Sequence, residues 1–139
     1  MATQSKTNTT KLTRQHNQIV RTQGVTYEKA KAFAIEVIAL CNELRDKGEY
    51  VMSKQILKAG TSIGANYCEA LGSESPQDFV HKLSISLKEA NETYFWLDIL
   101  HSSGYIDTNR FDTMKAQLEE IYKMMNSASI TVKKRNNIS

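Results

Sequence analysis

The sequence contains little proline, glycine and cysteine, and each shortage limits the fold. There are one proline and six glycines in 139 residues, so long stretches carry no residue that interrupts a helix. The two cysteines, Cys41 and Cys68, are too few for a disulfide framework. We therefore expect a mostly helical chain, large enough to form one hydrophobic core without a metal or a disulfide.

Long apolar runs are also missing. No segment approaches the roughly 18–20 apolar residues of a membrane-spanning helix, and residues 1–24 have no apolar core of the signal-peptide type. We therefore expect a soluble, cytoplasmic protein without a membrane partner. An organellar transit peptide is the alternative interpretation of the N-terminus, because this segment is basic, rich in threonine and free of acidic residues.

Acidic residues are absent from both ends of the chain. Residues 1–24 and 133–139 contain seven basic residues: Lys6, Lys11, Arg14, Arg21, Lys133, Lys134 and Arg135. Residues 25–131 contain 11 basic and 15 acidic residues, so a mildly acidic body lies between two basic ends. We predict a flexible basic arm over 1–24 and a basic tail over 133–139. The seven residues are the candidates for binding a nucleic-acid backbone, and solvated tails are the alternative.

Four segments have the apolar period of amphipathic helices. We predict helices over residues 26–46, 53–71, 76–103 and 108–132. The predicted N-caps are Thr26, Ser53, Ser75 and Asp107. Gly48 and Gly104 are predicted to end the first and third helices. Because the connections are short, residues 25–132 are predicted to form an all-α, antiparallel up-down-up-down four-helix bundle.

Residues 56–71 are small and apolar on two sides of the predicted second helix. One stripe consists of Ile56, Gly60, Ile63, Tyr67 and Ala70. An adjacent stripe consists of Leu57, Thr61, Gly64, Cys68 and Leu71. Gly60 and Gly64 lie about one turn apart, so another helix can approach closely there and offset their helix-propensity cost of about 1 kcal/mol each. Two stripes predict two packing partners.

The same helix carries two polar residues that need partners. Asn66 and Glu69 are three residues apart, so they share a face, and buried amide and carboxylate groups must be hydrogen-bonded. We expect them to form a network between helices or subunits that fixes the packing register. A ligand or partner site is the alternative.

The second half of the third helix is apolar on nearly every side. Between Tyr94 and Leu100 only Asp98 is polar enough to mark a solvent face. One bundle core buries one stripe, so a further surface is needed to cover the rest. The residues expected at an interface between copies of the chain are Tyr94, Phe95, Trp96 and Ile99.

The sequence shows no motif for catalysis or metal binding. The acid-x-x-His pairs at Asp78 and Asp98 lie twenty residues apart on one predicted helix, about 30 Å, whereas a di-metal site needs such pairs on facing helices. Cys41 and Cys68 are expected about 20 Å apart in height, too far for a disulfide. We therefore predict no catalytic residue, metal, cofactor or small-molecule substrate.

Short motifs spread over residues 27–132 carry a family resemblance. They are Tyr27-Glu28-Lys29-Ala30, Ser62-Ile63-Gly64-Ala65-Asn66 with Glu69-Ala70, Ser75 with Phe79, Lys82-Leu83-Ser84-Ile85-Ser86, Lys88-Glu89-Ala90, Glu92-Thr93 and Trp96-Leu97. In this order they resemble the four-helix-bundle family called 23S ribosomal RNA intervening-sequence proteins. The resemblance implies a cyclic homopentamer of four-helix bundles. It extends distantly to the accessory variability determinant, which works with a reverse transcriptase in diversity-generating retroelements.

Two functions stay open at this point. The first is a non-enzymatic oligomeric scaffold that associates with RNA or DNA or is accessory to a reverse transcriptase, as the resemblance implies. The second is a protein-interaction scaffold without a nucleic-acid role, which the acidic body favours.

Overall fold

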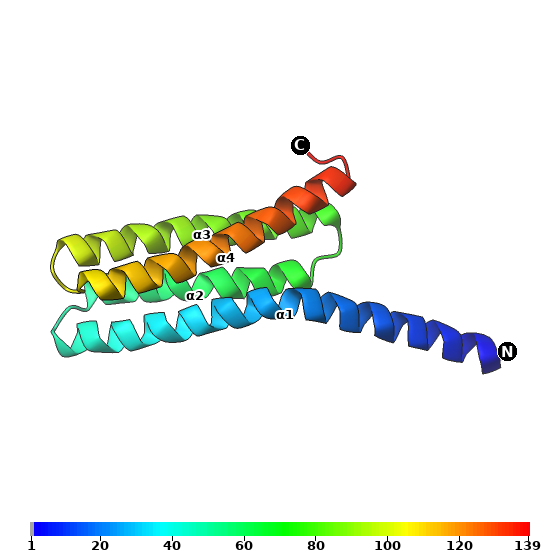
Figure 1. The fold of residues 1–139 in the computed structure, drawn as a ribbon, viewed down its shortest axis with the longest axis horizontal. Helices are drawn as coiled ribbons and strands as arrows, with labels where there is room; N and C mark the ends of the chain where they lie inside the picture. The colour runs from blue at the N-terminus through cyan, green and yellow to red at the C-terminus, as the bar shows by residue number, and fades with distance from the viewer. Residues whose placement is uncertain (1) are drawn as a thin grey trace.

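A computed structural model describes the backbone of residues 2–139 and the side chains of residues 24–139. The described backbone has no strand and consists of four helices, α1 (Ala2–Asp46), α2 (Val51–Leu71), α3 (Pro76–Ser102) and α4 (Thr108–Arg135). The predicted all-α class is therefore confirmed. Figure 1 shows the helices side by side, with the chain turning back at each connection. None of the described helices is long and apolar enough to cross a membrane.

The start of α1 differs from the predicted one. α1 begins at Ala2, whereas the apolar pattern placed its start near residue 26. Thr26 is therefore not an N-cap; it is buried, and its side chain hydrogen-bonds to Tyr67. One interior glycine costs a helix only about 1 kcal/mol, which does not stop it. Because the side chains before Gly24 lie outside the described residues, the flexible arm over 1–24 stays a prediction.

Local signals set most of the other helix ends. Ser75 and Asp107 are the N-caps of α3 and α4, and their side-chain oxygens accept backbone N–H bonds at 3.1 and 2.7 Å. Gly48 and Gly104 adopt φ of 82° and 80°, a left-handed conformation that favours glycine. Each lies two residues after the last residue of its helix, in the turn where the helix ends, as predicted.

The N-cap of α2 is Tyr50, which makes no side-chain capping hydrogen bond, and the preceding residue, Glu49, accepts a backbone N–H bond of the first turn instead. α2 begins at Val51, and the Glu49 carboxylate accepts the Met52 N–H at 2.7 Å. The predicted cap, Ser53, lies inside the first turn, and its hydroxyl donates to the Tyr50 carbonyl at 3.0 Å. A carboxylate this close to the helix start also interacts favourably with the helix dipole.

Side-chain hydrogen bonds join pairs of residues on neighbouring helices, some near the turns and some midway along the helices. These pairs are Cys41 with Ser53, Ile63 with Ser86, and His101 with Thr108. Ion pairs between Lys29 and Glu120 and between Glu43 and Arg110 connect α1 to α4. Each helix contacts two others, α1 and α3 both packing on α2 and α4. The described helices therefore enclose one central core.

Each helix contributes one stripe to this core. The predicted α2 stripe of Ile56, Gly60, Ile63, Tyr67 and Ala70 is buried throughout. On α3, however, Ser86 and Thr93 are buried, whereas the larger apolar residues next to them, Leu87 and Tyr94, are half-buried and exposed. Because α3 is apolar on several sides, the period alone cannot select the face that turns inward.

Helices α1 and α2 approach most closely at Gly60. An ideal Cβ at Gly60 would lie 2.8 Å from Val37 Cγ2, which is a clash. At Gly64 the same atom would lie 3.5 Å from the Ala30 Cβ, an ordinary contact distance. A close approach of another helix was predicted at both glycines, but only at Gly60 does the neighbouring helix leave no room for a side chain.

We expect Gly60→Ala to lower the free energy of unfolding by about 1–2 kcal/mol. The clash with stiff, β-branched Val37 costs more than the helix propensity gained. The matched control, Gly64→Ala, is expected to raise the same free energy by up to about 1 kcal/mol. Urea unfolding followed by circular dichroism measures both values. Equal effects of the same sign would contradict the asymmetry between the two sites.

Candidate functional site

The aromatic residues of α3 lie at different depths. Phe95 and Tyr94 are 53% and 40% exposed, whereas Trp96 and Ile99 are half-buried. The Trp96 ring meets the Phe95 ring edge-on with a centroid distance of 5.2 Å, and Trp96 also packs against the core. Of the four residues expected at an interface, Phe95 therefore exposes the largest fraction of its surface.

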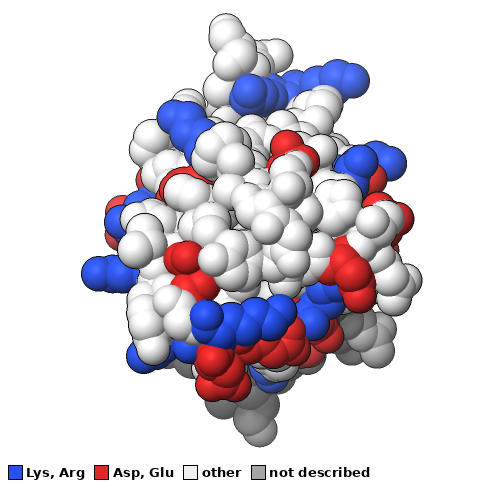
Figure 2. Space-filling model, turned by 90° about the vertical axis from the view of Figure 1, so that its left-hand side faces the viewer, with Lys and Arg blue, Asp and Glu red and all other residues white. Residues whose placement is uncertain are grey.

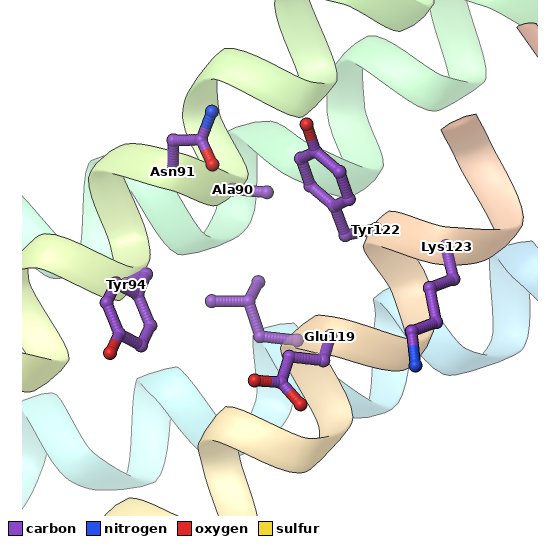
Figure 3. A pocket seen from close by; sticks show the side chains of 7 residues that line it. Ala90, Asn91, Tyr94, Glu119, Tyr122 and Lys123 are labelled. Carbon is purple, nitrogen blue, oxygen red and sulfur yellow. The ribbon is translucent and has the colours of Figure 1, made fainter.

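Tyr94 forms one wall of a small pocket between α3 and α4 (Figure 3). The pocket has a volume of about 240 Å³ and is lined by Ala90, Asn91, Tyr94, Leu118, Glu119, Tyr122 and Lys123. Figure 3 shows Asn91 and Tyr94 entering from α3, and Glu119, Tyr122 and Lys123 entering from α4. This volume is below the roughly 300–1,000 Å³ of typical small-molecule sites. The pocket is about the size of one inserted side chain.

A larger groove lies between α1 and α2, and we call it the α1–α2 groove. It has a volume of about 440 Å³ and is lined by Ile38, Cys41, Asn42, Arg45, Tyr50, Ser53, Lys54 and Leu57. Ile38 is 46% exposed here, whereas Val37 and Leu40 on the same helix are buried. Leu57, from the second apolar stripe of α2, is half-buried. Of the five residues of that stripe, Leu57 is the one that lines the groove.

The thiol of Cys41 closes the inner side of this groove. Cys41 is 3% exposed and its Sγ donates to the Ser53 carbonyl at 3.1 Å. Burial raises the pKa of this thiol, while the charge of Arg45 acts in the opposite direction. A protonated, hydrogen-bonded thiol is a poor nucleophile. Cys68 is exposed, and both cysteines are free thiols.

The two polar residues predicted to share a network on α2 have separate partners. The Asn66 Nδ2 donates to the Ser62 carbonyl of its own helix at 2.8 Å. Glu69, expected to be buried, is exposed, and its Oε2 accepts from Lys82 Nζ of α3 at 3.0 Å. This ion pair raises the pKa of Lys82. Only Glu69 therefore links two helices, and it does so at the surface, where ion pairs contribute little.

Two hydroxyl groups of α3 lie inside the core. The Ser86 Oγ donates to the Ile63 carbonyl at 2.7 Å and lies 3.2 Å from the Met125 Sδ. The Thr93 Oγ1 donates to the Glu89 carbonyl of its own helix at 2.7 Å. A small hydroxyl that finds a nearby carbonyl can be buried at low cost. The spacing of apolar residues along the sequence does not identify buried serine and threonine positions of this kind.

The predicted basic residues lie at the two ends of the chain. The side chains of four lie outside the described residues: Lys6, Lys11, Arg14 and Arg21. The other three belong to the last turn of α4: Lys133, Lys134 and Arg135. There their charges interact favourably with the helix dipole. Figure 1 shows both chain ends on the same side of the bundle, opposite the turns after α1 and α3.

The residues weighed as metal ligands do not form a cluster. Among the side chains that the structure describes, no group of three His, Cys, Asp or Glu could hold a metal ion. The His101 Nε2 lies 3.0 Å from the Thr108 Oγ1, and its ring stacks on Phe111 at a centroid distance of 4.4 Å. His101 therefore connects α3 to α4.

Comparisons with known proteins agree with the fold. The model of the family described as 23S rRNA-intervening sequence protein matches residues 23–127. A crystal structure of a protein with unknown function, from the S23 ribosomal protein family of Bacteroides thetaiotaomicron VPI-5482, has 42% sequence identity to this chain. The similarity covers 75% of this chain and 97% of that protein, with a TM-score of 0.73. No curated protein matches the chain.

Glu89 of α3 is an acid whose environment disfavours its charge. Partial burial raises the pKa of this carboxyl, the nearby Glu92 raises it further, and Lys58 of α2 acts in the opposite direction. Because the folded pKa lies above the unfolded one, the folded state binds the proton more tightly. The contribution of Glu89 to stability is therefore fully present below the unfolded pKa and is lost as pH rises through the folded pKa.

We expect Glu89→Gln to be more stable than the parent chain at pH 7, by less than about 1 kcal/mol. The difference should vanish below about pH 3, where the carboxyl is protonated in both states. Urea unfolding at a series of pH values measures it. The control, Glu36→Gln, removes an exposed carboxylate of α1 and reports the effect of losing one negative charge. A larger advantage at pH 4 than at pH 7 would contradict this assignment.

Proposed function

Because the chain belongs to the family of 23S rRNA-intervening sequence proteins, we propose that it is a non-enzymatic, cytoplasmic scaffold associated with nucleic acid. In this proposal, up-down-up-down four-helix bundles assemble into a closed homo-oligomer, and the pentamer is the assembly that the family resemblance implies. The nucleic acid, RNA or DNA, is held on its own or together with a reverse transcriptase. The observation that supports the proposal is that both chain ends, which carry the basic residues, lie at the end of the bundle opposite the turns after α1 and α3 (Figure 1).

The uncovered apolar surfaces support self-assembly. Phe95 is 53% exposed on α3, and Ile38 and Tyr50 are 46% and 62% exposed beside the α1–α2 groove. Exposed apolar surfaces of this kind mark interaction sites. Two different surfaces on one chain fit a head-to-tail contact, which closes into a ring when the rotation permits.

Assembly would multiply a weak phosphate-binding surface. Each chain carries seven basic residues in 1–24 and 133–139, and the body between them has more acidic than basic residues. In a ring whose axis runs along the bundles, every copy presents its chain ends on the same side. Several weak, sequence-independent phosphate contacts then act together. The acidic body would keep nucleic acid away from the remaining surface.

A protein-interaction scaffold is the second candidate function, and the opposite end of the bundle favours it. Figure 2 shows this end, where the centre of the face is largely free of charged side chains and most charges lie toward the margin. Tyr50 and Val51, beside the turn after α1, are 62% and 72% exposed. A face with few charges at its centre and with exposed apolar side chains suits a protein partner better than a phosphate backbone.

The nucleic-acid role can be tested by measuring binding of the full-length chain at two salt concentrations. The ligands are single-stranded RNA and double-stranded DNA. We expect binding that weakens steeply with salt. Replacing Lys133, Lys134 and Arg135 by glutamine should lower the affinity and reduce the salt slope by about 0.7–0.9 for each phosphate that these side chains no longer neutralise. Fluorescence anisotropy at low and moderate salt measures both quantities.

The matched control replaces three exposed lysines of the helical body, Lys31, Lys88 and Lys123, by glutamine. It should leave affinity and salt slope nearly unchanged. An equal loss of affinity in the control would show that general charge, not the basic ends, carries the binding. No binding by the intact chain at low salt would rule out the nucleic-acid role and leave the protein-interaction scaffold.

A further inference from the structure

An exposed aromatic ring lies between two acidic residues on the outer side of α3. Glu92, Phe95 and Asp98 are spaced three residues apart and all three are exposed, so they follow one another on successive turns. The Glu92 Oε1 accepts from Trp96 Nε1 at 3.4 Å. Among the described residues, neither acid takes part in an ion pair. We call Glu92, Phe95 and Asp98 the Phe95 stripe.

The α1–α2 groove has the complementary character. Ile38, Tyr50 and Leu57 supply its apolar surface, and Arg45 and Lys54 supply two positive charges. Both cations are exposed. Within the described part of the chain, neither is ion-paired. One surface therefore offers an aromatic ring between two acids, and the other offers an apolar groove with two bases.

The two surfaces lie at the same height along the bundle. Ser86 of α3 contacts Ile63 of α2, and these two helices run in opposite directions. Phe95 lies nine residues after Ser86, and Lys54 lies nine residues before Ile63. At 1.5 Å per residue, both are about 14 Å from that contact and in the same direction. The Phe95 stripe is therefore level with the α2 wall of the groove.

The α1 wall of the groove lies at this height as well. Cys41 of α1 contacts Ser53 at 3.1 Å, and Ser53 precedes Lys54. Arg45 lies further toward the turn after α1, and Asp98 lies further toward the turn after α3. Figure 1 shows both turns at the same end of the bundle. The acids and bases therefore occur in matching order.

Because the Phe95 stripe and the α1–α2 groove lie at the same height along the bundle, only some kinds of symmetry can join them. A rotation about an axis parallel to the bundle preserves height, so the stripe of one copy meets the groove of the next without a shift. Repeating this contact produces a head-to-tail ring. A twofold contact of each stripe with its own copy would instead bring Glu92 and Asp98 of two chains together, and like charges oppose such a contact.

We propose that the Phe95 stripe of one copy of this chain docks into the α1–α2 groove of the next copy. Phe95 packs on Ile38 and Leu57, Asp98 pairs with Arg45, and Glu92 pairs with Lys54. This inference rests on the proposed homo-oligomer and identifies the two surfaces that join its subunits.

Reversing the charges of full-length chains tests the contact. We expect each of two charge-reversed variants to reduce the mass measured by multi-angle light scattering to that of the 15.7 kDa monomer. One variant carries Glu92→Lys and Asp98→Lys, and the other carries Arg45→Glu and Lys54→Glu. The variant that combines all four substitutions restores opposite charges and should recover the parent mass. A misfolded chain would not be rescued in this way, and circular dichroism checks the helix content of each variant.

Two matched controls separate this contact from general surface effects. Glu36→Lys with Asp112→Lys reverses two exposed acids outside both surfaces and should keep the parent mass. Phe95→Ala should weaken assembly at least about tenfold, as expected for an aromatic anchor. Ile130→Ala, which truncates another side chain that is 45% exposed, should not.

The possible outcomes distinguish this contact from the assembly itself. Dissociation by either pair with recovery in the combined variant supports the docking. Charge-reversed variants that keep the mass of an oligomeric parent overturn the docking and leave the homo-oligomer standing. Dissociation without recovery in the combined variant also overturns this pairing. A parent chain that is itself a monomer overturns the homo-oligomer and the docking together.

Discussion

The close approach of α1 to α2 at Gly60 fixes the arrangement of the surfaces around it. Val37 occupies the space that a Cβ at Gly60 would need, so the two helices cannot exchange or shift their facing stripes freely. With Gly60 turned inward, the Cys41 thiol reaches the Ser53 carbonyl, and Leu57 lies on the outer side in the α1–α2 groove. One missing side chain therefore determines which apolar residues face the core and which form the groove.

The hydroxyl groups of α3 have the corresponding effect on the opposite side. Ser86 and Thr93 are fully buried, and both satisfy their hydroxyl groups with carbonyls. Because these small residues occupy inner positions, Tyr94 and Phe95 remain at the surface of the helix. A helix that filled its inner face with its largest side chains would leave no aromatic surface outside. The two buried hydroxyl groups of α3 and its exposed Phe95 ring therefore both follow from the rotation of α3 about its own axis.

Local chemistry made part of this structure predictable. The caps at Ser75 and Asp107 and the buried α2 stripe follow from residues that act within one or two turns. The burial of Ser86 in place of Leu87, and the exposure of Ile38, depend on how neighbouring helices fill the core, which no single segment encodes. The sequence predicts an aromatic surface on α3, and Tyr94 and Phe95 are exposed there, whereas Trp96 packs against the core. The groove was not foreseen, since it combines residues from two helices.

The proposed ring requires that the Phe95 stripe and the α1–α2 groove of neighbouring copies cover each other. Native mass spectrometry of the full-length chain at decreasing concentration tests it most directly. We predict one assembled species of five 15.7 kDa chains that gives way to monomers without a ladder of intermediates, because opening a ring exposes both surfaces at once. Monomers at every concentration, or a ladder of dimers, trimers and longer chains, would contradict a closed ring.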